Sequence, residues 1–563
     1  MKIIRSYNRR TILITGFLLI FIHYLIFSYF FPNSQGKLGH DYSFFFPALL
    51  DGFFWYNSNG LFSIPWFTPS FCGGVPLFPH PASPYFFVPQ FLTFVMNPLA
   101  SIKLTFIIFG ALGFWGFYFF SRRIISASIS ISFLAATLFL FNGFFSYRII
   151  IGHLEFHSIM LVPWCAYLIM SPSPNLKPSP WQIWFNTIMA GVIITYVFLS
   201  GMGQLLFALL LSIILICLMS VTFYPNILSL KSLFLRFFSA GCIAIGLSIS
   251  KLIATLSFLS HFPRSDYQLP GFPDISDLLM VLGKSLFLWP AHELAKKVIV
   301  NMQWLLDRHE FEFGITIIPL FLICIGLIYQ IYRIVTRKAW ELPGIRKALL
   351  IFICLFICII PIALNYYSPA WNQFLKSIPI LKSSGQFVRW FILYIPSMIL
   401  LTTIIVESTP LLMKNQFLLS IIGIFAIVII NVFPDRSFYH EQSYNPSEIL
   451  QAYQKVRKHE WTPRITNISI CVDKSGNILF NQNNSLTKGY SQLFCYDPIF
   501  GYRLENFPKK GLEPGRILKE NDGYLNLKNP ACYIFPNENN CMPGDHFTID
   551  QKEEASHKTK NRK

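Results

Sequence analysis

Long apolar runs recur along most of this chain, and they constrain its fold more than any other feature. The first, at 11–31, reads TILITGFLLIFIHYLIFSYFF and is long enough to cross the hydrocarbon core of a bilayer. Of the 563 residues, 53% are hydrophobic and only 13% are charged. A soluble core cannot bury that much apolar surface, so the composition predicts an all-α polytopic membrane protein.

The apolar windows predict about eleven transmembrane helices. They lie at 11–31, 98–120, 124–145, 154–170, 183–200, 204–222, 236–257, 313–332, 348–365, 391–407 and 416–433. The first run does not read as a cleavable signal peptide, because it is too long, lacks a small-residue cleavage site and is followed by further spans.

The formal net charge of +18 reports topology. Basic residues cluster beside alternate spans, at Arg5, Arg9, Arg10, Arg122, Arg123, Lys231, Arg236, Arg333, Arg337, Lys338, Arg346 and Lys347. All of them fall on one side of the membrane if the N-terminus is cytoplasmic, as the positive-inside rule requires. This placement argues against a nucleic-acid partner.

An odd number of spans places the polar C-terminal part on the opposite, periplasmic side. We therefore expect a transmembrane domain at 1–433, a periplasmic domain at 434–550 and a disordered charged tail at 551–563. Alternating runs at 465–472 and 476–482 predict strands, and hence a small β-rich module.

Four cysteines of the C-terminal part are candidates for disulfide bonds, which an oxidising compartment permits. They are Cys471, Cys495, Cys532 and Cys541. Four cysteines allow three pairings, and the sequence does not choose among them.

Three segments on the outer side are too long for simple turns: 32–97, 258–312 and 366–390. Each mixes proline, aromatic residues and a few charges, which suits short helices lying at the membrane interface. Elaborate outer loops beside short cytoplasmic connections indicate that the protein works at its outer face.

Asp41 opens the first outer loop, within Gly39-His40-Asp41. A carboxylate near the membrane plane can deprotonate a hydroxyl, and apolar surroundings raise its basicity. The alternative is that Asp41 caps a helix beginning near Tyr42. Asp51, ten residues further on, is expected to be a surface acid at the far end of that helix.

A second cluster follows the third span. His153 and His157 are four residues apart, so on a helix they share a face and could hold one divalent metal. Glu155 points away on a regular helix, but an irregular turn after Gly152 could bring it in. Arg148 precedes them. The alternative is a polar turn whose histidines bond to backbone carbonyls.

Three cations lie in or near the outer ends of spans: Lys251, Arg264 and Arg389. A phosphate group at the outer leaflet needs cations at this depth, and arginine offers a bidentate grip. Snorkelling at span ends explains Arg264 and Arg389 equally well, but it explains Lys251 less well because Lys251 is inside its span.

Glu310 and Glu312 stand just before the eighth span, in Arg308-His309-Glu310-Phe311-Glu312. They could bind acceptor hydroxyls, although an ion pair with Arg308 or Arg389 is the favoured use. The chain has no Walker loop, HExxH, dinucleotide glycine fingerprint or GxSxG, so ATP-driven chemistry is not indicated.

Taken together, these positions resemble the GT-C superfamily of integral-membrane glycosyltransferases, over roughly residues 1–433. The texture is nearest to bacterial YfhO-like membrane proteins. The resemblance rests on the early acid, the pair Gly152-His153, the late Arg389, and the loop residues Trp66, Pro69, Cys72, Gly73, Gly74 and Pro76.

The resemblance implies that Asp41 is the general base or a metal-supporting acid, with Glu155 or His153 as its partner. It also implies that Lys251, Arg264 and Arg389 bind a lipid phosphate. Many GT-C enzymes carry an Asp-x-Asp-like motif, whereas this chain has His40-Asp41 with Ser43 two residues on. That departure leaves metal dependence and catalytic activity open.

The sequence thus predicts a glycosyltransferase of a Gram-negative inner membrane, moving a sugar from a polyprenyl-phosphate-linked donor to an envelope glycolipid or polysaccharide. Catalysis is assigned to Asp41 and Glu155. The residues assigned to substrate binding are His40, Arg148, Lys251, Arg264, Glu310 and Arg389. The alternatives are a transporter or flippase of a lipid-linked glycan, and a non-catalytic GT-C-like scaffold.

Overall fold

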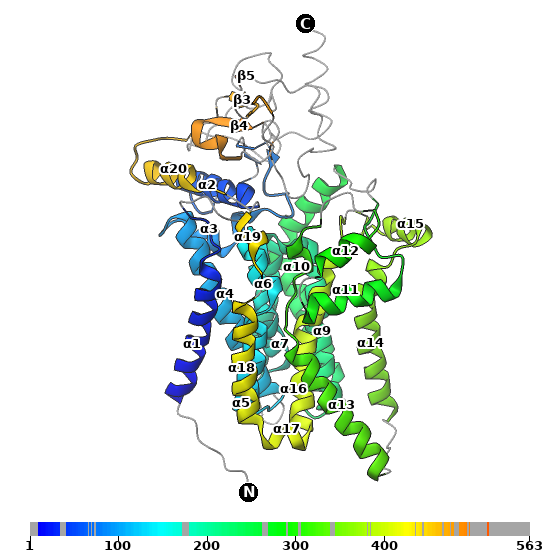
Figure 1. Cartoon of the computed structure of the whole chain (residues 1–563). Helices are drawn as coiled ribbons and strands as arrows, with labels where there is room; N and C mark the ends of the chain where they lie inside the picture. Colours follow the sequence, from blue (N-terminus) through cyan, green and yellow to red (C-terminus); the bar gives the residue numbers. More distant parts are fainter. Residues whose placement is uncertain are drawn as a thin grey trace.

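The computed structural model is a bundle of long helices with different structures at its two ends (Figure 1). One end, called the outer end below, carries α2 (Tyr42–Asn59) and α20 (Ser447–Arg457), and α1 (Arg9–Ser28) begins at the opposite end. The structure describes residues 9–33, 41–171, 179–261, 268–337, 344–492, 495 and 515–516, with gaps at 63, 66, 69, 72–74, 289–290, 302–305, 380, 383, 434, 442–443, 464, 466, 473–474 and 478–482.

Eight segments of the described chain are long and apolar enough to cross a membrane. They are Arg9–Ser28, Pro98–Ile124, Ile129–Ile151, Pro180–Phe223, Leu230–Ser257, Ile318–Thr336, Ile345–Asn365 and Val388–Ser408. Two apolar helices are shorter, Leu154–Met170 and Gln416–Val432. The predicted helical membrane class is confirmed, and the number of crossings stays a prediction.

The segment Pro180–Phe223 is 44 residues long and contains two helices, α8 (Pro180–Val197) and α9 (Leu206–Phe223). The helix breaks at Gly201, whose φ of +94° lies in the left-handed region that glycine tolerates. This break divides the segment between the two predicted spans at 183–200 and 204–222.

The centre of the bundle is formed by helices that are buried over most of their length. These are α4 (Pro98–Phe119), α5 (Ile129–Leu140), α6 (Gly143–Ile151), α7 (Val162–Met170), α9 and α16 (Tyr394–Ser408), with α18 (Gln416–Val432) packed against α5. Helices such as α10 (Leu230–His261), α13 (Ile318–Arg337) and α14 (Ile345–Asn365) expose large apolar side chains, as α1 and α18 also do. Such faces suit a lipid environment.

Short elements at the outer end fill the three long predicted loops. The first loop contains α2, strands β1 (Phe67–Thr68) and β2 (Val75–Pro76), which pair antiparallel, and then η1 (Pro84–Phe86) and α3 (Val88–Leu92). The second contains α11 (Ile275–Phe287), α12 (His292–Val298) and η7 (Arg308–Phe311), and the third contains α15 (Pro369–Ser377) and begins η8 (Val388–Leu393). The expectation of short helices in these loops is confirmed.

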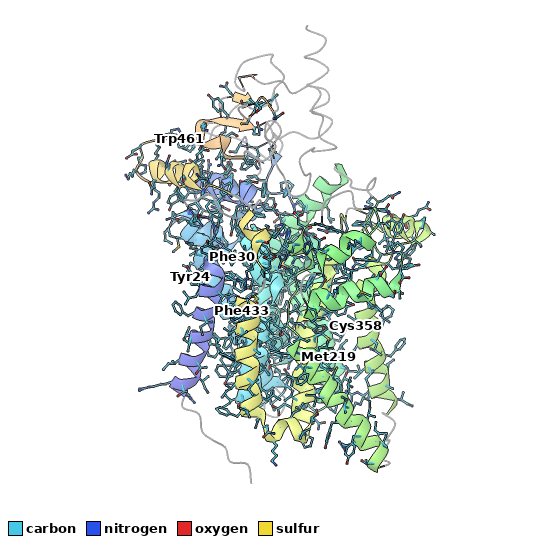
Figure 2. All side chains as sticks on the ribbon, in the orientation of Figure 1. Tyr24, Phe30, Met219, Cys358, Phe433 and Trp461 are labelled. Carbon is cyan, nitrogen blue, oxygen red and sulfur yellow. The ribbon has the colours of Figure 1, made fainter. Side chains whose placement is uncertain are left out.

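After α18 the chain continues at the outer end as α19 (Ser437–Glu441), α20, η9 (Asn483–Lys488) and three short strands. β3 (Asn467–Ser469) lies between β4 (Tyr490–Gln492), which is parallel to it, and β5 (Gly515–Arg516), which is antiparallel. Trp461 lies at the outer end (Figure 2). It packs edge-on against Phe54 of α2, with ring centroids 5.5 Å apart. A β-rich periplasmic domain stays a prediction.

The predicted cysteine framework is described only in part. Cys495 is disulfide-bonded, whereas Cys471 carries a free thiol, so these two are not paired with each other. Cys532, Cys541 and the expected disordered tail at 551–563 also lie outside the described residues.

Asp51 is fully buried, and the expectation of a surface acid is wrong. Its carboxylate accepts hydrogen bonds from the hydroxyls of Thr68 at 3.0 Å, Ser70 and Tyr85. Asp51 faces inward from α2 and draws the first outer loop against that helix. Burial raises the pKa of Asp51 to about 6, although the three hydroxyls act to lower it.

The Asp51 cluster predicts a pH-dependent stability. Because the pKa of Asp51 is higher in the folded than in the unfolded state, its stabilising contribution is complete below pH 3.8 and is lost as the pH rises through about 6. The loss amounts to about 3 kcal/mol. Thermal unfolding between pH 4 and 7 should therefore show a steeper fall for the wild type than for Asp51→Asn. Parallel curves would contradict this assignment.

Candidate functional site

α6 is the short helix on which the site is built. It begins after Asn142, whose side-chain oxygen accepts a hydrogen bond from the Phe145 N–H at 2.9 Å, which is the usual bond of an N-cap asparagine. The N–H of Gly143 donates to the carbonyl of Phe313 at 2.9 Å. The start of α6 is thereby fixed to the segment that follows η7.

α6 ends at Gly152, which adopts φ +108°. A Cβ at this position would lie 2.4 Å from the backbone nitrogen of Tyr42 and 2.8 Å from the carbonyl carbon of Asp41. Only glycine satisfies both the backbone conformation and this close approach. The N–H of Asp41 also donates to the carbonyl of Ile151 at 3.2 Å, so the end of α6 and the start of α2 are in direct contact.

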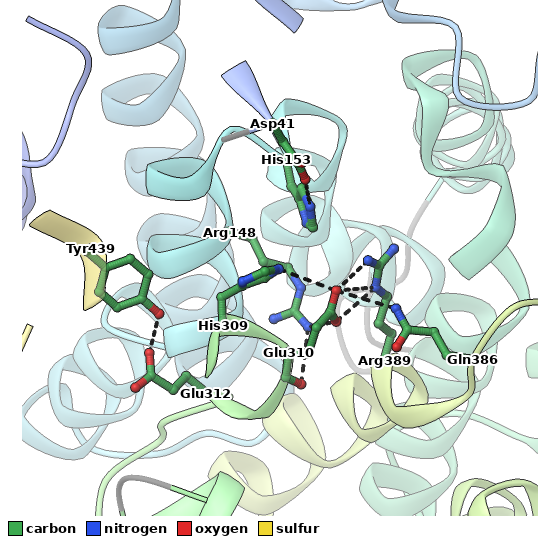
Figure 3. A network of polar contacts seen from close by, with 9 residues as sticks. All are labelled: Asp41, Arg148, His153, His309, Glu310, Glu312, Gln386, Arg389 and Tyr439. Atoms are coloured by element: carbon green, nitrogen blue, oxygen red, sulfur yellow. Dashed lines mark hydrogen bonds and ion pairs between the residues drawn. The ribbon is translucent and has the colours of Figure 1, made fainter. Parts of the chain in front are cut away.

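This contact brings Asp41 against His153 (Figure 3). Asp41 stands at the N-cap position of α2, but its side chain makes no capping bond, and its Oδ2 instead pairs with His153 Nε2. Both side chains are buried. Burial lowers the pKa of His153 although Asp41 acts to raise it, so a neutral ring donates Nε2–H to the carboxylate. Nδ1 of His153 has no partner within the described chain.

Glu310 is clamped between two arginines from different elements (Figure 3). Arg148 of α6 donates from Nη2 to Glu310 Oε2 at 2.9 Å. Arg389 of η8 donates from Nε to both carboxylate oxygens, at 3.1 and 3.0 Å, and from Nη2 to Oε1. Burial alone would raise the pKa of Glu310, but the two guanidinium groups hold it well below its usual range. Glu310 is therefore a carboxylate.

Arg148 is fully buried and retains binding capacity. Its guanidinium carbon lies 4.0 Å from the centroid of the Phe144 ring and 5.3 Å from that of Phe313, which are cation–π distances. Its Nε and Nη1 have no hydrogen-bond partner among the described residues. The sequence placed Arg148 in a loop between the predicted spans at 124–145 and 154–170, but in the structure Arg148 lies in the helix α6.

Glu155 lies in η3 (Leu154–Leu161), the irregular turn expected after Gly152. It is buried, and its Oε2 has no partner within the described chain. A Cβ on Gly201 would lie 3.2 Å from Cβ of Glu155, so the break between α8 and α9 makes room for this carboxyl group.

His157 and Lys251 are occupied by contacts that hold the outer loops. His157 Nδ1 lies 2.5 Å from the carbonyl of Leu154, and its Nε2 lies 2.6 Å from the hydroxyl of Tyr196. Lys251 is buried and donates to the carbonyls of Phe78 and His80, at 2.7 Å for the latter. In this arrangement His157 has no free ligand atom. Lys251 anchors the first loop to α10.

Several predicted residues lie outside the described part of the chain, and their roles stay predictions. They are His40, Trp66, Pro69, Cys72, Gly73, Gly74 and Arg264. The structure adds His309 and Gln386, which lie beside Glu310 (Figure 3). Neither had a distinguishing sequence signal, although His309 lies within the charged run that drew attention to Glu310.

Among the described residues, His153, His309 and Glu310 could hold a metal, since each offers a ligand atom within 4.8 Å of the others. Two imidazoles and a carboxylate suit zinc. However, Glu310 is engaged by Arg148 and Arg389, whose two positive charges oppose a divalent cation beside them. The residues do not fit a resident metal in this arrangement, and no chemical step below depends on one.

The fold and the site define a helical membrane protein with a buried acid–imidazole pair and an arginine–glutamate cluster near its outer end. No protein-family model matches the chain, and no curated protein matches it. Solved structures of the Archaeoglobus fulgidus oligosaccharyltransferase are similar in part.

The apo form of that oligosaccharyltransferase has a TM-score of 0.43 and 12% identity, over 88% of this chain and 65% of the other. The form tethered to an acceptor peptide containing the NVT sequon has a TM-score of 0.38 and 12% identity, over 86% and 64%. The complex of AglB with an inhibitory peptide and a dolichol-phosphate has a TM-score of 0.33 and 14% identity, over 75% and 57%. The chain thus spans less than two thirds of the length of these proteins.

Gly152→Ala should separate Asp41 from His153. The left-handed conformation alone costs an alanine about 1–3 kcal/mol, and the added Cβ would also force the Asp41–Tyr42 backbone away. We expect a lower melting temperature and loss of the transfer activity proposed below. Gly241→Ala is the matched control, because a Cβ there meets no atom within 4 Å. Equal effects of the two substitutions would refute this role for Gly152.

Arg389→Gln should strengthen divalent-metal binding. Removing this guanidinium releases Oε1 of Glu310 from Arg389, while Arg148 still holds Oε2. Oε1 can then act as a ligand beside His153 and His309, with one opposing charge fewer. Isothermal titration with Zn²⁺ should show at least about tenfold tighter binding than for the wild type. The double variant Arg389→Gln/His309→Ala should lose that gain. Tight stoichiometric binding by the wild type would contradict the poor fit argued above.

Proposed function

We propose that this protein is a membrane glycosyltransferase. It moves a sugar from a polyprenyl-phosphate-linked donor to a hydroxyl-bearing acceptor, at the outer face of the membrane in which it lies. The observation that carries the proposal is the convergence of an acid–imidazole pair and two arginines near the outer end of an apolar bundle. Acceptor activation needs a base, and departure of a lipid phosphate needs cations. This site offers both within one buried cluster.

The base in this proposal is the Asp41–His153 pair. The acceptor oxygen attacks the anomeric carbon, the bond from that carbon to the phosphate oxygen breaks, and the acceptor proton passes to Nδ1 of His153. The Asp41 carboxylate accepts Nε2–H and stabilises the imidazolium that forms, as a carboxylate does in other acid–imidazole pairs. A single displacement of this kind inverts the anomeric centre.

The arginines take the leaving group. Arg148 has two donor atoms without partners within the described chain, and Arg389 is the more exposed of the two guanidinium groups, at 15%. Guanidinium groups bind phosphate oxygens in a bidentate manner. The unpartnered carboxyl oxygen of Glu155 is placed to accept a hydrogen bond from a sugar or acceptor hydroxyl.

The same proposal includes the cellular setting. The N-terminus is cytoplasmic, the C-terminal part is periplasmic and the membrane is the inner membrane. Basic clusters beside alternate spans support this orientation. The opposite placement of the start of α1 and the C-terminal strands in the bundle also supports it (Figure 1). The acceptor is an envelope glycolipid or polysaccharide.

Asp41→Asn should abolish transfer while leaving the fold intact. An asparagine cannot stabilise the imidazolium, and loss of general-base catalysis lowers rates by about 10²–10⁴-fold. Mass spectrometry of envelope glycolipids and polysaccharides should show one sugar mass missing from a deletion strain, restored by the wild type and not by Asp41→Asn. Asp51→Asn is the matched control, because Asp51 is a buried carboxylate of the helix that Asp41 precedes, and within the described chain its hydrogen bonds come from three hydroxyls.

Full restoration by well-expressed Asp41→Asn would reject the acid–imidazole pair as the base. Transport of a lipid-linked glycan, or a scaffold role, would then explain the phenotype better. An unchanged glycan profile in the deletion strain would reject transfer to the envelope altogether.

A further inference from the structure

The chain returns to the site after its last spanning helix. α19 follows α18, and its Tyr439 is fully buried. The Tyr439 hydroxyl donates a hydrogen bond to Oε2 of Glu312 (Figure 3). Its ring stacks on that of Tyr147, with centroids 5.0 Å apart and planes 15° from parallel.

The two residues that Tyr439 contacts lie next to, or two positions from, the members of one ion pair. Tyr147 precedes Arg148 on α6, and Glu312 follows Glu310 by two residues. Tyr439 therefore contacts both of the segments, α6 and the end of η7, whose side chains meet in the Arg148–Glu310 pair.

Arg308, at the start of η7, makes a second set of contacts with the carboxylate of Glu312 and with the segment that carries Tyr439. Nε of Arg308 donates to Oε1 of Glu312 at 2.5 Å, and Nη2 of Arg308 donates to the carbonyl of Asp435 at 2.6 Å. The guanidinium carbon of Arg308 lies 5.9 Å from the centroid of the Tyr439 ring. The first residue of η7, Arg308, and the residue that follows η7, Glu312, are thus bonded to the segment Asp435–Tyr439.

The segment is itself anchored to the outer end of α1. Nη1 of Arg436 donates to the carbonyl of Ile26 at 3.3 Å, and its guanidinium carbon lies 4.9 Å from the ring centroid of Phe27 and 5.2 Å from that of Phe30. Tyr439 is held from one side by these contacts and acts on η7 from the other.

We propose that Tyr439 is a positioning residue, whose hydroxyl sets the conformation of η7 through Glu312 and so holds Glu310 between Arg148 and Arg389. The segment 435–441 thereby couples the C-terminal part of the chain to the site. The proposal rests on the proposed function only in making Glu310 part of a reacting site; the mechanical coupling stands on the contacts alone.

Tyr439→Phe tests the coupling, because it keeps the ring stack and removes only the hydroxyl. Tyr444→Phe is the matched control: its hydroxyl lies in the same connection but donates to Asn484 at 2.8 Å, away from η7. Hydrogen–deuterium exchange in lipid nanodiscs should be about tenfold to a hundredfold faster across 307–313 in Tyr439→Phe, since a hydrogen bond to a charged group is lost. Tyr444→Phe should leave that exchange unchanged.

A kinetic measurement then separates positioning from general stability. The rate of sugar transfer is measured while a lipid extract of the deletion strain is titrated as the source of donor. Tyr439→Phe should lower the maximal transfer rate, whereas the half-saturating amount of extract should stay within about twofold of the wild type. Tyr444→Phe should lower neither.

Unchanged exchange across 307–313 in Tyr439→Phe would overturn the coupling, whatever the activity. Faster exchange with an unchanged maximal rate would overturn the link to the reaction. If exchange responds and no variant, including the wild type, transfers a sugar, the coupling stands and the proposed function fails.

Discussion

The ion cluster of Arg148, Glu310 and Arg389 is the interaction on which the rest of the outer end depends. Each member comes from a different element, and each is buried or nearly so. Removing one partner from such a cluster leaves an uncompensated charge, at a cost of about 3–5 kcal/mol. The elements α6, η7 and η8 are therefore held together by this ion cluster as well as by their buried apolar side chains. Burying three charges carries a desolvation penalty, and such buried charges are common where a functional site uses them.

Much of the architecture could be predicted from hydropathy, because spanning helices need long apolar runs and little else resembles them. Arg148 was predicted as a site residue, but its place inside α6 was not. The apolar window at 124–145 ended before it, and the helix resumes only because Asn142 and Gly143 restart it. Asp51 was expected at the surface, and its burial could not be predicted from the local sequence. The three hydroxyls that bond to it come from up to 34 residues away.

The site illustrates the same division. The resemblance to GT-C enzymes implied Glu155 or His153 as the partner of Asp41, and the structure pairs Asp41 with His153. The clamp on Glu310 joins residues separated by 162 and 79 positions, so sequence could name the charges but not choose between ion pairs. His157 was a candidate to share a metal with His153, and the alternative was a polar turn whose histidines bond to backbone carbonyls. In η3 the Nδ1 of His157 contacts the carbonyl of Leu154 and its Nε2 contacts the hydroxyl of Tyr196. Helical spacing is a reliable guide only where a helix forms.

The contact of Gly152 with the Asp41–Tyr42 backbone has a consequence for recognising chains of this kind. Glycines of the membrane bundle also make close contacts, at Gly113 and Gly326 for example, but there an added Cβ would meet side chains that can shift rather than backbone. The site, by contrast, depends on one position without a side chain followed directly by an imidazole. A relative that keeps the apolar spans but carries a larger residue at the position of Gly152 would retain the architecture and lack the acid–imidazole pair. That one position therefore separates chains able to form the pair from those that inherit only the scaffold.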